Sequence, residues 1–238
     1  NYLEKIQFPH LASLYGAMLA GVSFVLMGAG IPTSIPGALD RLARHEEATY
    51  PIHVKGSCVG DDTTMRFDPS SLFSGIHPPL KRPYFIPIIA SNSLALVMRK
   101  KSNGRVDGFV IEGPTSGGHN APPRGKLQLS PTGEPIYGER DKVDLEEIRE
   151  LGLPFWVAGG CASAETLRDV MRAGGAGIQV GTAFALCEES GLDDRFKKHL
   201  LSKVADGTAR VLTDMAASPT GFPFKVVQIA GTLSQRDV

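Results

Sequence analysis

The sequence predicts an α/β protein made of successive βα units, most simply a (β/α)8 barrel. Three observations predict it: short apolar runs recur along the chain, each ends in glycine or small residues, and a helix-like stretch follows. The runs are nearly continuous rather than alternating, as expected for parallel strands covered by helices on the outside. The five predicted strands are Val22 to Met27, Phe85 to Ala90, Gly108 to Glu112, Phe155 to Ala158 and Gly177 to Val180.

The clearest predicted helix runs from Ser163 to Ala173. Its apolar residues, Ala164, Leu167, Val170 and Met171, share one face of a helix. Ser163 is a good N-cap, and two glycines follow as the stop signal. Similar but weaker patterns predict helices over Leu11 to Ala20, Pro36 to His45, Ser93 to Lys101 and Val143 to Leu151.

Two stretches interrupt this alternation and are interpreted as insertions. Residues 46–82 mix Pro, Gly, Asp and Ser with short β-like pieces such as His53 to Lys55, and residues 120–141 are rich in Pro and Gly. Long loops next to strand ends commonly form lids or substrate walls, although surface decoration is an equal alternative.

The number of strands is too small for a complete barrel. A (β/α)8 barrel needs about 250 residues, and the chain has 238. Five strands and two insertions nevertheless leave no room for three more βα units. We therefore expect one domain over residues 1–238 that holds about strands 4 to 8, with the N-terminal strands absent from this chain. A five-stranded open sheet is the competing interpretation.

Composition narrows the class of protein. The 25 basic and 25 acidic residues balance, and no basic run interleaved with aromatic residues suggests a nucleic-acid partner. Apolar stretches are much shorter than the roughly 20 residues that span a bilayer. The three cysteines have no metal-like spacing. The expectation is a cytoplasmic protein with a small-molecule substrate, no membrane or nucleic-acid partner and no metal, and a homo-oligomer is left open.

Two glycine loops follow the last two predicted strands. The first contains Gly159 and Gly160, and the second contains Gly181 and Thr182. In barrels a phosphate commonly lies at the loops after the seventh and eighth strands. Glycine lets the backbone approach the phosphate oxygens, and the N–H groups at the start of the next helix stabilise the charge. A tight strand-to-helix turn would explain one loop, but an ordered pair favours a phosphate site.

A histidine follows the strand that ends at Glu112. Gly117 and Gly118 precede His119 and would let the backbone pass flat against a planar ring. Imidazole titrates near neutral pH, so His119 is the predicted catalytic acid–base group. Glu112 is predicted to accept a hydrogen bond from a cofactor or to act as a second acid–base group, against the alternative of a salt-bridged carboxylate.

The remaining polar motifs predict less. The Gly28-Ala29-Gly30 segment carries only part of a dinucleotide-binding fingerprint, and Pro32 follows where the helix should continue, so a Rossmann fold is rejected in favour of a turn on the substrate side. Cys161 has no histidine close in sequence and is interpreted as a packing residue.

These motifs together resemble the nitronate monooxygenase family, formerly called 2-nitropropane dioxygenases. The likeness rests on Glu112 to His119 as the Gly-Gly-His segment, Val157 to Gly160 as the Ala-Gly-Gly loop, and Gln179 to Thr182 as the Gln-x-Gly-Thr loop. Flavin-dependent enoyl-acyl-carrier-protein reductases are similar in the same motifs. Ser116, where the family often has Ala, and Cys161, where it has an aliphatic residue, depart from the pattern.

The resemblance implies noncovalent FMN. Its phosphate would be held at Gly159, Gly160, Gly181 and Thr182, its ring would lie along Gly117 and Gly118, and Glu112 and Gln179 would complete the cofactor-binding set. The implied reaction is oxidation of alkyl nitronates and nitroalkanes with oxygen, in which His119 removes the α-proton of a nitroalkane. The alternatives are an NAD(P)H-dependent enoyl-thioester reductase, an FMN-binding partner without turnover, and a phosphosugar barrel without flavin.

Overall fold

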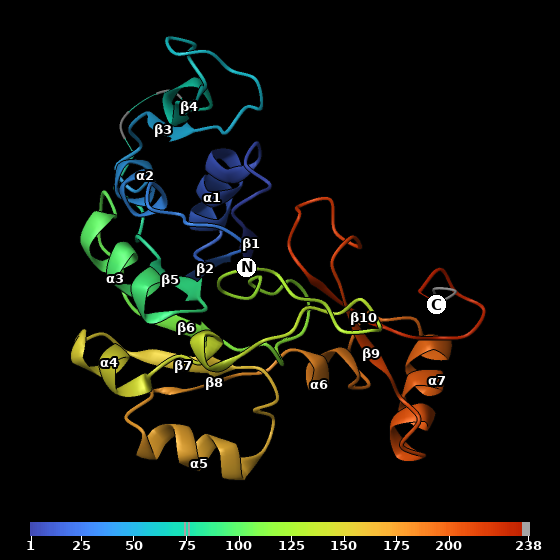
Figure 1. Ribbon diagram of the computed structural model, residues 1–238. Coiled ribbons are helices and arrows are strands. Elements are labelled where there is room, and N and C mark those ends of the chain that lie inside the picture. The colour runs from blue at the N-terminus through green and yellow to red at the C-terminus, as the bar shows by residue number, and fades with distance from the viewer. Residues whose placement is uncertain (74, 76, 235–238) are drawn as a thin grey trace. The chain divides into compact units, whose positions relative to one another are not determined.

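The computed structural model describes residues 1–73, 75 and 77–234. The chain divides into two compact units (Figure 1). Unit 1 comprises residues 1–109 and 150–154, and unit 2 comprises residues 110–149 and 155–238. Each unit carries a part of the predicted βα succession. The single domain over residues 1–238 stays a prediction.

Unit 1 begins with parallel βα units. Its elements are β1 (Tyr2–Leu3), α1 (His10–Leu19), β2 (Phe24–Gly28), α2 (Ile35–Leu42), β5 (Tyr84–Ile89) and α3 (Asn92–Lys101). Strand β2 pairs in parallel with β1 on one side and with β5 on the other, in the register Phe24 to Tyr84 and Met27 to Pro87. The predicted parallel α/β pattern is confirmed here. The short β1 was not predicted, because two residues carry no periodic signal.

The core of unit 1 lies between the helices and strands. Leu11 and Leu14 of α1, Leu39 of α2, Met27 of β2 and Phe85 of β5 have no solvent-exposed area. Fully burying an apolar side chain of this size contributes about 1.5–3 kcal/mol. The continuous apolar runs read from the sequence are therefore buried strands, as predicted.

The first insertion contains an antiparallel hairpin. Its strands are β3 (Ala48–Pro51) and β4 (Thr64–Phe67), and the 3-10 turn η1 (Pro69–Ser71) follows. The prediction of a β-like piece at His53 to Lys55 was wrong, because these residues form the exposed loop between the two strands. Residues 74 and 76 of the predicted insertion 46–82 lie outside the described residues.

Unit 2 carries the remaining predicted strands. They are β6 (Phe109–Glu112), whose first residue still belongs to unit 1, β7 (Phe155–Ala158) and β8 (Gly177–Gln179), in the order β6-β7-β8. Strands β7 and β8 are parallel. The 3-10 turn η2 (Glu139–Asp141) and helix α4 (Leu145–Glu150) precede β7, and helix α5 (Ala164–Arg172) connects β7 to β8 (Figure 1).

Helix α5 begins and ends as its sequence predicts. The Ser163 hydroxyl accepts a hydrogen bond from the Thr166 backbone N–H at 3.1 Å, and Gly174 adopts a φ of +89° just beyond the helix. The apolar face predicted for α5 included residues that are exposed to solvent. Val170 is buried, but Met171 is 58% exposed, and Ala164 is exposed as well.

The C-terminal part of unit 2 departs from the predicted pattern. It contains the short helix α6 (Thr182–Ala185), helix α7 (Asp194–Ala205) and the antiparallel pair β9 (Val211–Asp214) and β10 (Phe224–Val227), in the orange and red part of Figure 1. No residue of β10 is fully buried. Polar residues alternate irregularly in both strands, so periodicity alone did not reveal this hairpin.

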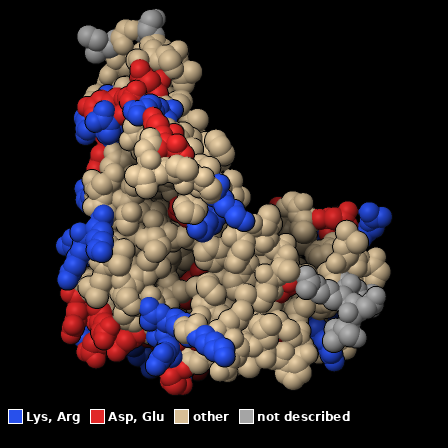
Figure 2. Space-filling view, turned by 45° about the horizontal axis from the view of Figure 1, so that its top comes forward, with Lys and Arg blue, Asp and Glu red and all other residues tan. Residues whose placement is uncertain are grey.

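The surface mixes charges of both signs. On the face drawn in Figure 2, basic and acidic side chains are interspersed among uncharged residues. Within the described part of the chain, no helix is both long and apolar enough to cross a membrane. The same residues contain no group of three or more His, Cys, Asp or Glu side chains arranged to hold a metal ion.

Candidate functional site

The loops after β6, β7 and β8 meet in unit 2. A Cβ atom added at Gly159, after β7, would lie 2.6 Å from the Ser116 Oγ and 2.8 Å from the Ser116 backbone nitrogen. A Cβ at Gly117 would lie 3.2 Å from the Thr182 Oγ1, after β8. The three sequence motifs, more than 60 residues apart from first to last, therefore form one site.

The first glycine loop needs its glycines for the backbone. Gly159 has a φ of +99° and Gly160 a φ of +66°, which are unfavourable for residues with a side chain. The backbone N–H groups of Gly160 and Cys161 donate to no acceptor within the described residues. They are free to bind an anion.

The second glycine loop differs from expectation. Gly181 has a φ of −118°, which any residue adopts, and a Cβ there would meet no atom within 4 Å. Helix α6, which begins at Thr182, has only four residues. The predicted dipole of a following helix is therefore small at this loop, and Gly181 is exposed to solvent.

His119 is held by the C-terminal hairpin region. Its Nε2 lies 2.6 Å from the Ser218 Oγ, and its ring meets the Phe224 ring edge to face at a centroid distance of 4.7 Å. Burial lowers the pKa of His119 below its ordinary value. Burial therefore favours the neutral imidazole, which is the form able to accept a proton.

Glu112 lies at the end of β6 without a basic partner. Burial raises the pKa of its carboxyl to about 7, and a hydrogen bond from the Asn120 Nδ2 at 3.3 Å opposes this rise. No described ion pair involves Glu112, so the alternative of a salt-bridged strand-end carboxylate is wrong. Near neutral pH the side chain is able to donate or to accept a hydrogen bond.

Three buried oxygens near these loops have no hydrogen-bond partner within the described residues. They are Ser116 Oγ, Asn120 Oδ1 and Gln179 Oε1. Ser116 and Asn120 are 5% and 2% exposed. A buried polar atom without a partner costs about 1–3 kcal/mol. A polar ring with N–H donors would satisfy such acceptors, so the residues present fit a bound heterocycle.

Ser218, Thr220 and Phe224 were missed by the sequence predictions. Ser218 and Thr220 follow β9 in the segment Ser218-Pro219-Thr220-Gly221, which has the sequence of an ordinary polar turn, and Phe224 begins β10. Only the backbone pairing of residues 118–120 with residues 223–225 brings them to His119. The one available signal was a hydroxyl-rich turn ahead of an apolar run.

Two other predicted features lie apart from this group. Cys161 is partly buried and its thiol donates to the Gly159 carbonyl, which agrees with a packing role. The Gly28-Ala29-Gly30 turn belongs to unit 1, where a side chain at Gly30 would collide with Glu4. Gly30 is therefore required by close packing inside unit 1, and the substrate-side role of this turn stays a prediction.

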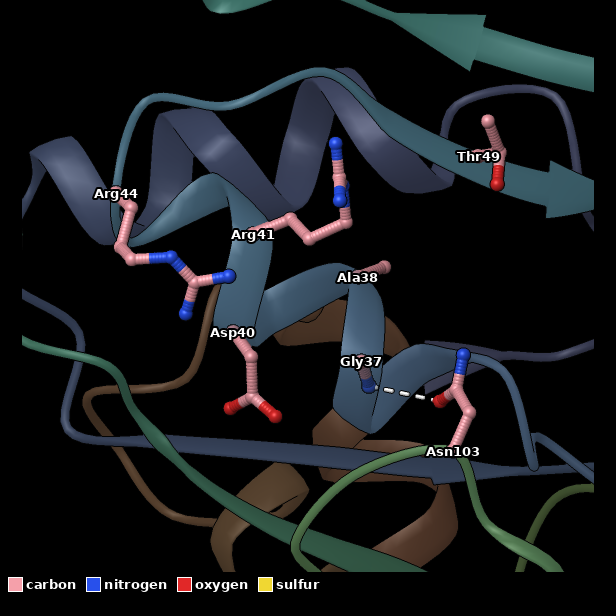
Figure 3. Close-up of a pocket in the computed structure, with 7 residues that line it drawn as sticks. All are labelled: Gly37, Ala38, Asp40, Arg41, Arg44, Thr49 and Asn103. Atoms are coloured by element: carbon pink, nitrogen blue, oxygen red, sulfur yellow. Dashed lines mark hydrogen bonds between the residues drawn. The ribbon is translucent and has the colours of Figure 1, made fainter.

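A hollow of about 320 Å³ in unit 1 contains none of the predicted site residues. Figure 3 shows its lining, in which the Gly37 N–H donates to the Asn103 side chain. Its two arginines, Arg41 and Arg44, both form ion pairs with Glu46. Glu46 offsets part of their positive charge, and Asp40 adds a carboxylate to the same lining.

Comparison with known proteins identifies the family. The nitronate monooxygenase family model matches residues 82–217, more than half of the chain. A nitronate monooxygenase of Pseudomonas aeruginosa is 32% identical over 121 residues, which cover 49% of this chain and 32% of that protein. The (3aS,4S,5R,7aS)-5-hydroxy-7a-methyl-1-oxo-octahydro-1H-indene-4-carboxyl-CoA dehydrogenase of Mycobacterium tuberculosis is 26% identical over 141 residues, covering 59% of this chain and 35% of that protein.

Solved structures share the fold. FabK from Thermotoga maritima, as a point mutant, superposes with a TM-score of 0.55 at 19% identity, covering 93% of this chain and 53% of that one. A nitroalkane oxidase from Streptomyces ansochromogenes gives 0.53 at 19% identity, covering 90% and 48%. The chain thus spans about half the length of these structures and about a third of the curated relatives. On the family match and the meeting of its three motifs in unit 2, the chain belongs to the nitronate monooxygenase family of flavin-dependent oxidoreductases.

Proposed function

We propose that this chain provides the FMN site and the proton-transfer histidine of an oxidoreductase that oxidises alkyl nitronates and nitroalkanes with oxygen. The observation that carries the proposal is the meeting of the Gly-Gly-His, Ala-Gly-Gly and Gln-x-Gly-Thr segments in one site with unpartnered buried acceptors. The proposal places both units in a (β/α)8 barrel, which the likeness to solved structures over most of the chain supports.

The phosphate of FMN would lie at the two glycine loops. The free N–H groups of Gly160 and Cys161 and the Thr182 hydroxyl are donors suited to phosphate oxygens. Among the described residues, no atom lies within 4 Å of a Cβ placed at Gly181, so this exposed loop leaves room for a phosphate.

The flavin ring would be bound by polar side chains. Within the described part of the chain, Gln179 Oε1 and Asn120 Oδ1 are both unpartnered acceptors, and one of them would accept the single ring N–H of oxidised FMN, at N3. Glu112, with a pKa of about 7, is suited to either direction of hydrogen bond. When bound, FMN supplies a two-electron acceptor that is reoxidised by oxygen.

His119 performs the proton transfer. A nitroalkane carries an acidic hydrogen on the carbon next to the nitro group, and a neutral imidazole is able to remove it near pH 7. Burial keeps His119 neutral by lowering its pKa. A preformed nitronate has already lost that proton and needs no base.

The substrate pair tests this role. We expect His119→Ala to reduce turnover of a nitroalkane by about 100-fold or more, the usual contribution of a general base, with much less effect on the matching nitronate. The measurement is oxygen consumption by the FMN-loaded protein with both substrates across pH 6–9. Equal losses with both substrates would remove the base assignment.

A second function is supported by one relative. The Mycobacterium tuberculosis relative is a dehydrogenase of a carboxyl-CoA compound, so a CoA thioester is the substrate of at least one relative. In an enoyl-thioester reductase, NAD(P)H would supply the hydride and His119 would protonate the α-carbon. Rapid anaerobic bleaching of the flavin absorbance by NADPH, with recovery on adding an enoyl thioester, would favour this reaction. Bleaching by a nitronate alone would favour the first.

A non-catalytic role is the third hypothesis. An FMN-binding partner module would use the insertions at 46–82 and 120–141 as docking surfaces. Turnover by the isolated protein in either assay would exclude it. The cytoplasmic location and the small-molecule substrate are part of the same proposal.

A further inference from the structure

A hydroxyl pair outside the predicted site contacts the histidine. The Ser218 Oγ lies 2.6 Å from His119 Nε2 and 2.8 Å from the Thr220 Oγ1. Ser218 and Thr220 lie beyond residues 82–217, where the family model matches. The direction of these two hydrogen bonds is set by the proton and the lone pairs that the Ser218 hydroxyl has available.

A serine hydroxyl has one proton to donate and two lone pairs to accept with. The backbone N–H of Thr220 donates to the Ser218 Oγ at 3.3 Å and uses one lone pair. One proton and one lone pair remain for His119 Nε2 and the Thr220 hydroxyl. The two hydrogen bonds must therefore run in the same direction, either from His119 through Ser218 to Thr220 or the reverse.

Only one of these directions leaves a working base. When Nε2–H donates to Ser218, the lone pair of Nδ1 is available for a proton from the substrate. When Ser218 donates to Nε2, that lone pair is occupied and the ring proton is on Nδ1. Among the described residues, no hydrogen bond is formed with His119 Nδ1.

The surrounding backbone holds residue 119 beside the segment that carries Ser218. The Lys225 N–H donates to the Gly118 carbonyl at 2.9 Å, and the Asn120 N–H donates to the Pro223 carbonyl at 2.8 Å. Phe224 packs against the ring between these two bonds. The His119 peptide is thus paired on both sides with the segment that carries Ser218.

Among the described residues, the charged groups on segments beside His119 include buried Asp214, which is opposite Phe224 in the β9–β10 register. Glu112 approaches through Asn120, which is adjacent to His119 in the chain. Lys225 shares the paired strand segment, but its ammonium group donates to the Thr213 hydroxyl. The direct polar partner of the ring is therefore the uncharged Ser218.

We propose that Ser218, supported by Thr220, is a positioning residue that accepts the proton of His119 Nε2 and so assigns Nδ1 as the atom that exchanges a proton with the substrate. This inference rests on the proposed acid–base role of His119. It applies equally to proton removal from a nitroalkane and to protonation of an enoyl product.

The test combines nitrogen NMR of labelled histidine with kinetics. In the wild type at neutral pH, the ¹⁵N shifts of His119 should report the Nε2–H tautomer. In Ser218→Ala we expect a mixture of tautomers and a lower pKa of His119, because the imidazolium loses its acceptor. Nitroalkane kcat should fall about tenfold with little change in KM, as expected for loss of one hydrogen bond, while nitronate turnover stays unchanged.

Two variants control for folding. Ser218→Thr keeps the hydroxyl and should preserve the tautomer and the rates. Ser130→Ala removes a hydroxyl of the same unit that bonds only within its own loop, to Thr132 and Glu134, and should change nothing.

The outcomes separate this inference from the proposed function. If Ser218→Ala keeps the wild-type tautomer, pKa and nitroalkane turnover while His119→Ala abolishes turnover, the positioning role is overturned and the base remains. If His119→Ala itself leaves nitroalkane turnover intact, the proposed function fails, and the role of Ser218 in proton transfer fails with it.

Discussion

At the scale of single residues, the candidate site contains polar groups whose pKa is shifted by burial or whose hydrogen bonding is incomplete. Glu112 has a carboxyl pKa near 7, His119 has a lowered pKa, and Asn120 bridges the strand end and the loop through its Nδ2. Perturbed acid–base groups cluster at functional sites because burial and missing partners are tolerated where a ligand completes them. The three unpartnered oxygens belong to the same pattern.

The raised pKa of Glu112 predicts that the free energy of unfolding depends on pH. Burial raises its pKa from 4.5 to about 7, so the folded protein binds this proton more tightly than the unfolded chain. Its ionisation therefore costs stability as pH rises from about 4.5 to 7, in total about 3 kcal/mol. Glu112→Gln keeps an acceptor for Asn120 and should gain stability over the wild type across that range.

Urea unfolding at several pH values measures this difference. Glu139→Gln is the matched control, because Glu139 is exposed and pairs only with Lys142. Its unfolding curve should follow the wild type at every pH. Parallel pH profiles for Glu112→Gln and the wild type would show that Glu112 ionises normally in the folded protein.

At the scale of elements, the site is a property of loops held by strands and helix caps. Strand β7 ends at Ala158, the glycine loop follows, and the Ser163 cap begins α5. The loop is therefore fixed at both ends. Its Gly159 lies so close to Ser116 that any side chain would push against backbone as well as side-chain atoms.

Gly159→Ala should disrupt both stability and flavin binding. The φ of +99° and the 2.8 Å approach to the Ser116 nitrogen predict a loss of about 1–3 kcal/mol in the free energy of unfolding. Because the change moves the Ser116 loop, we also expect weaker binding of FMN, measured by quenching of its fluorescence.

Gly133→Ala separates the two causes of that loss. Gly133 has a φ of +79° but open space around it, so only the conformational cost of about 1 kcal/mol applies. FMN affinity should not change in this control. Equal effects of the two variants on FMN affinity would contradict a phosphate role for the Gly159 loop.

At the scale of the whole molecule, the chain consists of two units, each with its own part of the βα succession. All nine predicted site residues, from Glu112 to Thr182, belong to unit 2. The large apolar core lies mainly in unit 1, whereas unit 2 buries few large side chains, among them Phe155 and Ile111. A ligand that binds folded unit 2 and not the unfolded chain should add to stability by mass action.

FMN should raise the melting temperature of the chain, and riboflavin should raise it less. At 100 times its dissociation constant a ligand adds about 2.7 kcal/mol to folding stability. Riboflavin lacks the phosphate assigned to the glycine loops, so it serves as the matched control. Equal shifts with the two flavins, measured by differential scanning fluorimetry or calorimetry, would argue against the phosphate site.

Local sequence signals predicted the βα units well. Continuous apolar runs identified β2, β5, β6, β7 and β8 within two residues at each end, because buried parallel strands need apolar residues on both faces. The capping signals around Ser163 and Gly174 identified α5. The hairpin β9–β10 and helix α7 were not predicted, because their partly exposed residues show no regular alternation of apolar and polar positions.

By itself the sequence determined the succession of strands and helices, the glycine loops and the presence of His119 at a strand end, because each depends on residues close together in the chain. Only the tertiary structure decided that Ser116 meets Gly159, that Gly117 meets Thr182 and that Ser218 meets His119. These contacts join residues 43 to 99 positions apart. Such pairings depend on the order of the strands in the sheet and on the pairing of the C-terminal hairpin region with residues 118–120. Local sequence preferences do not determine either of them.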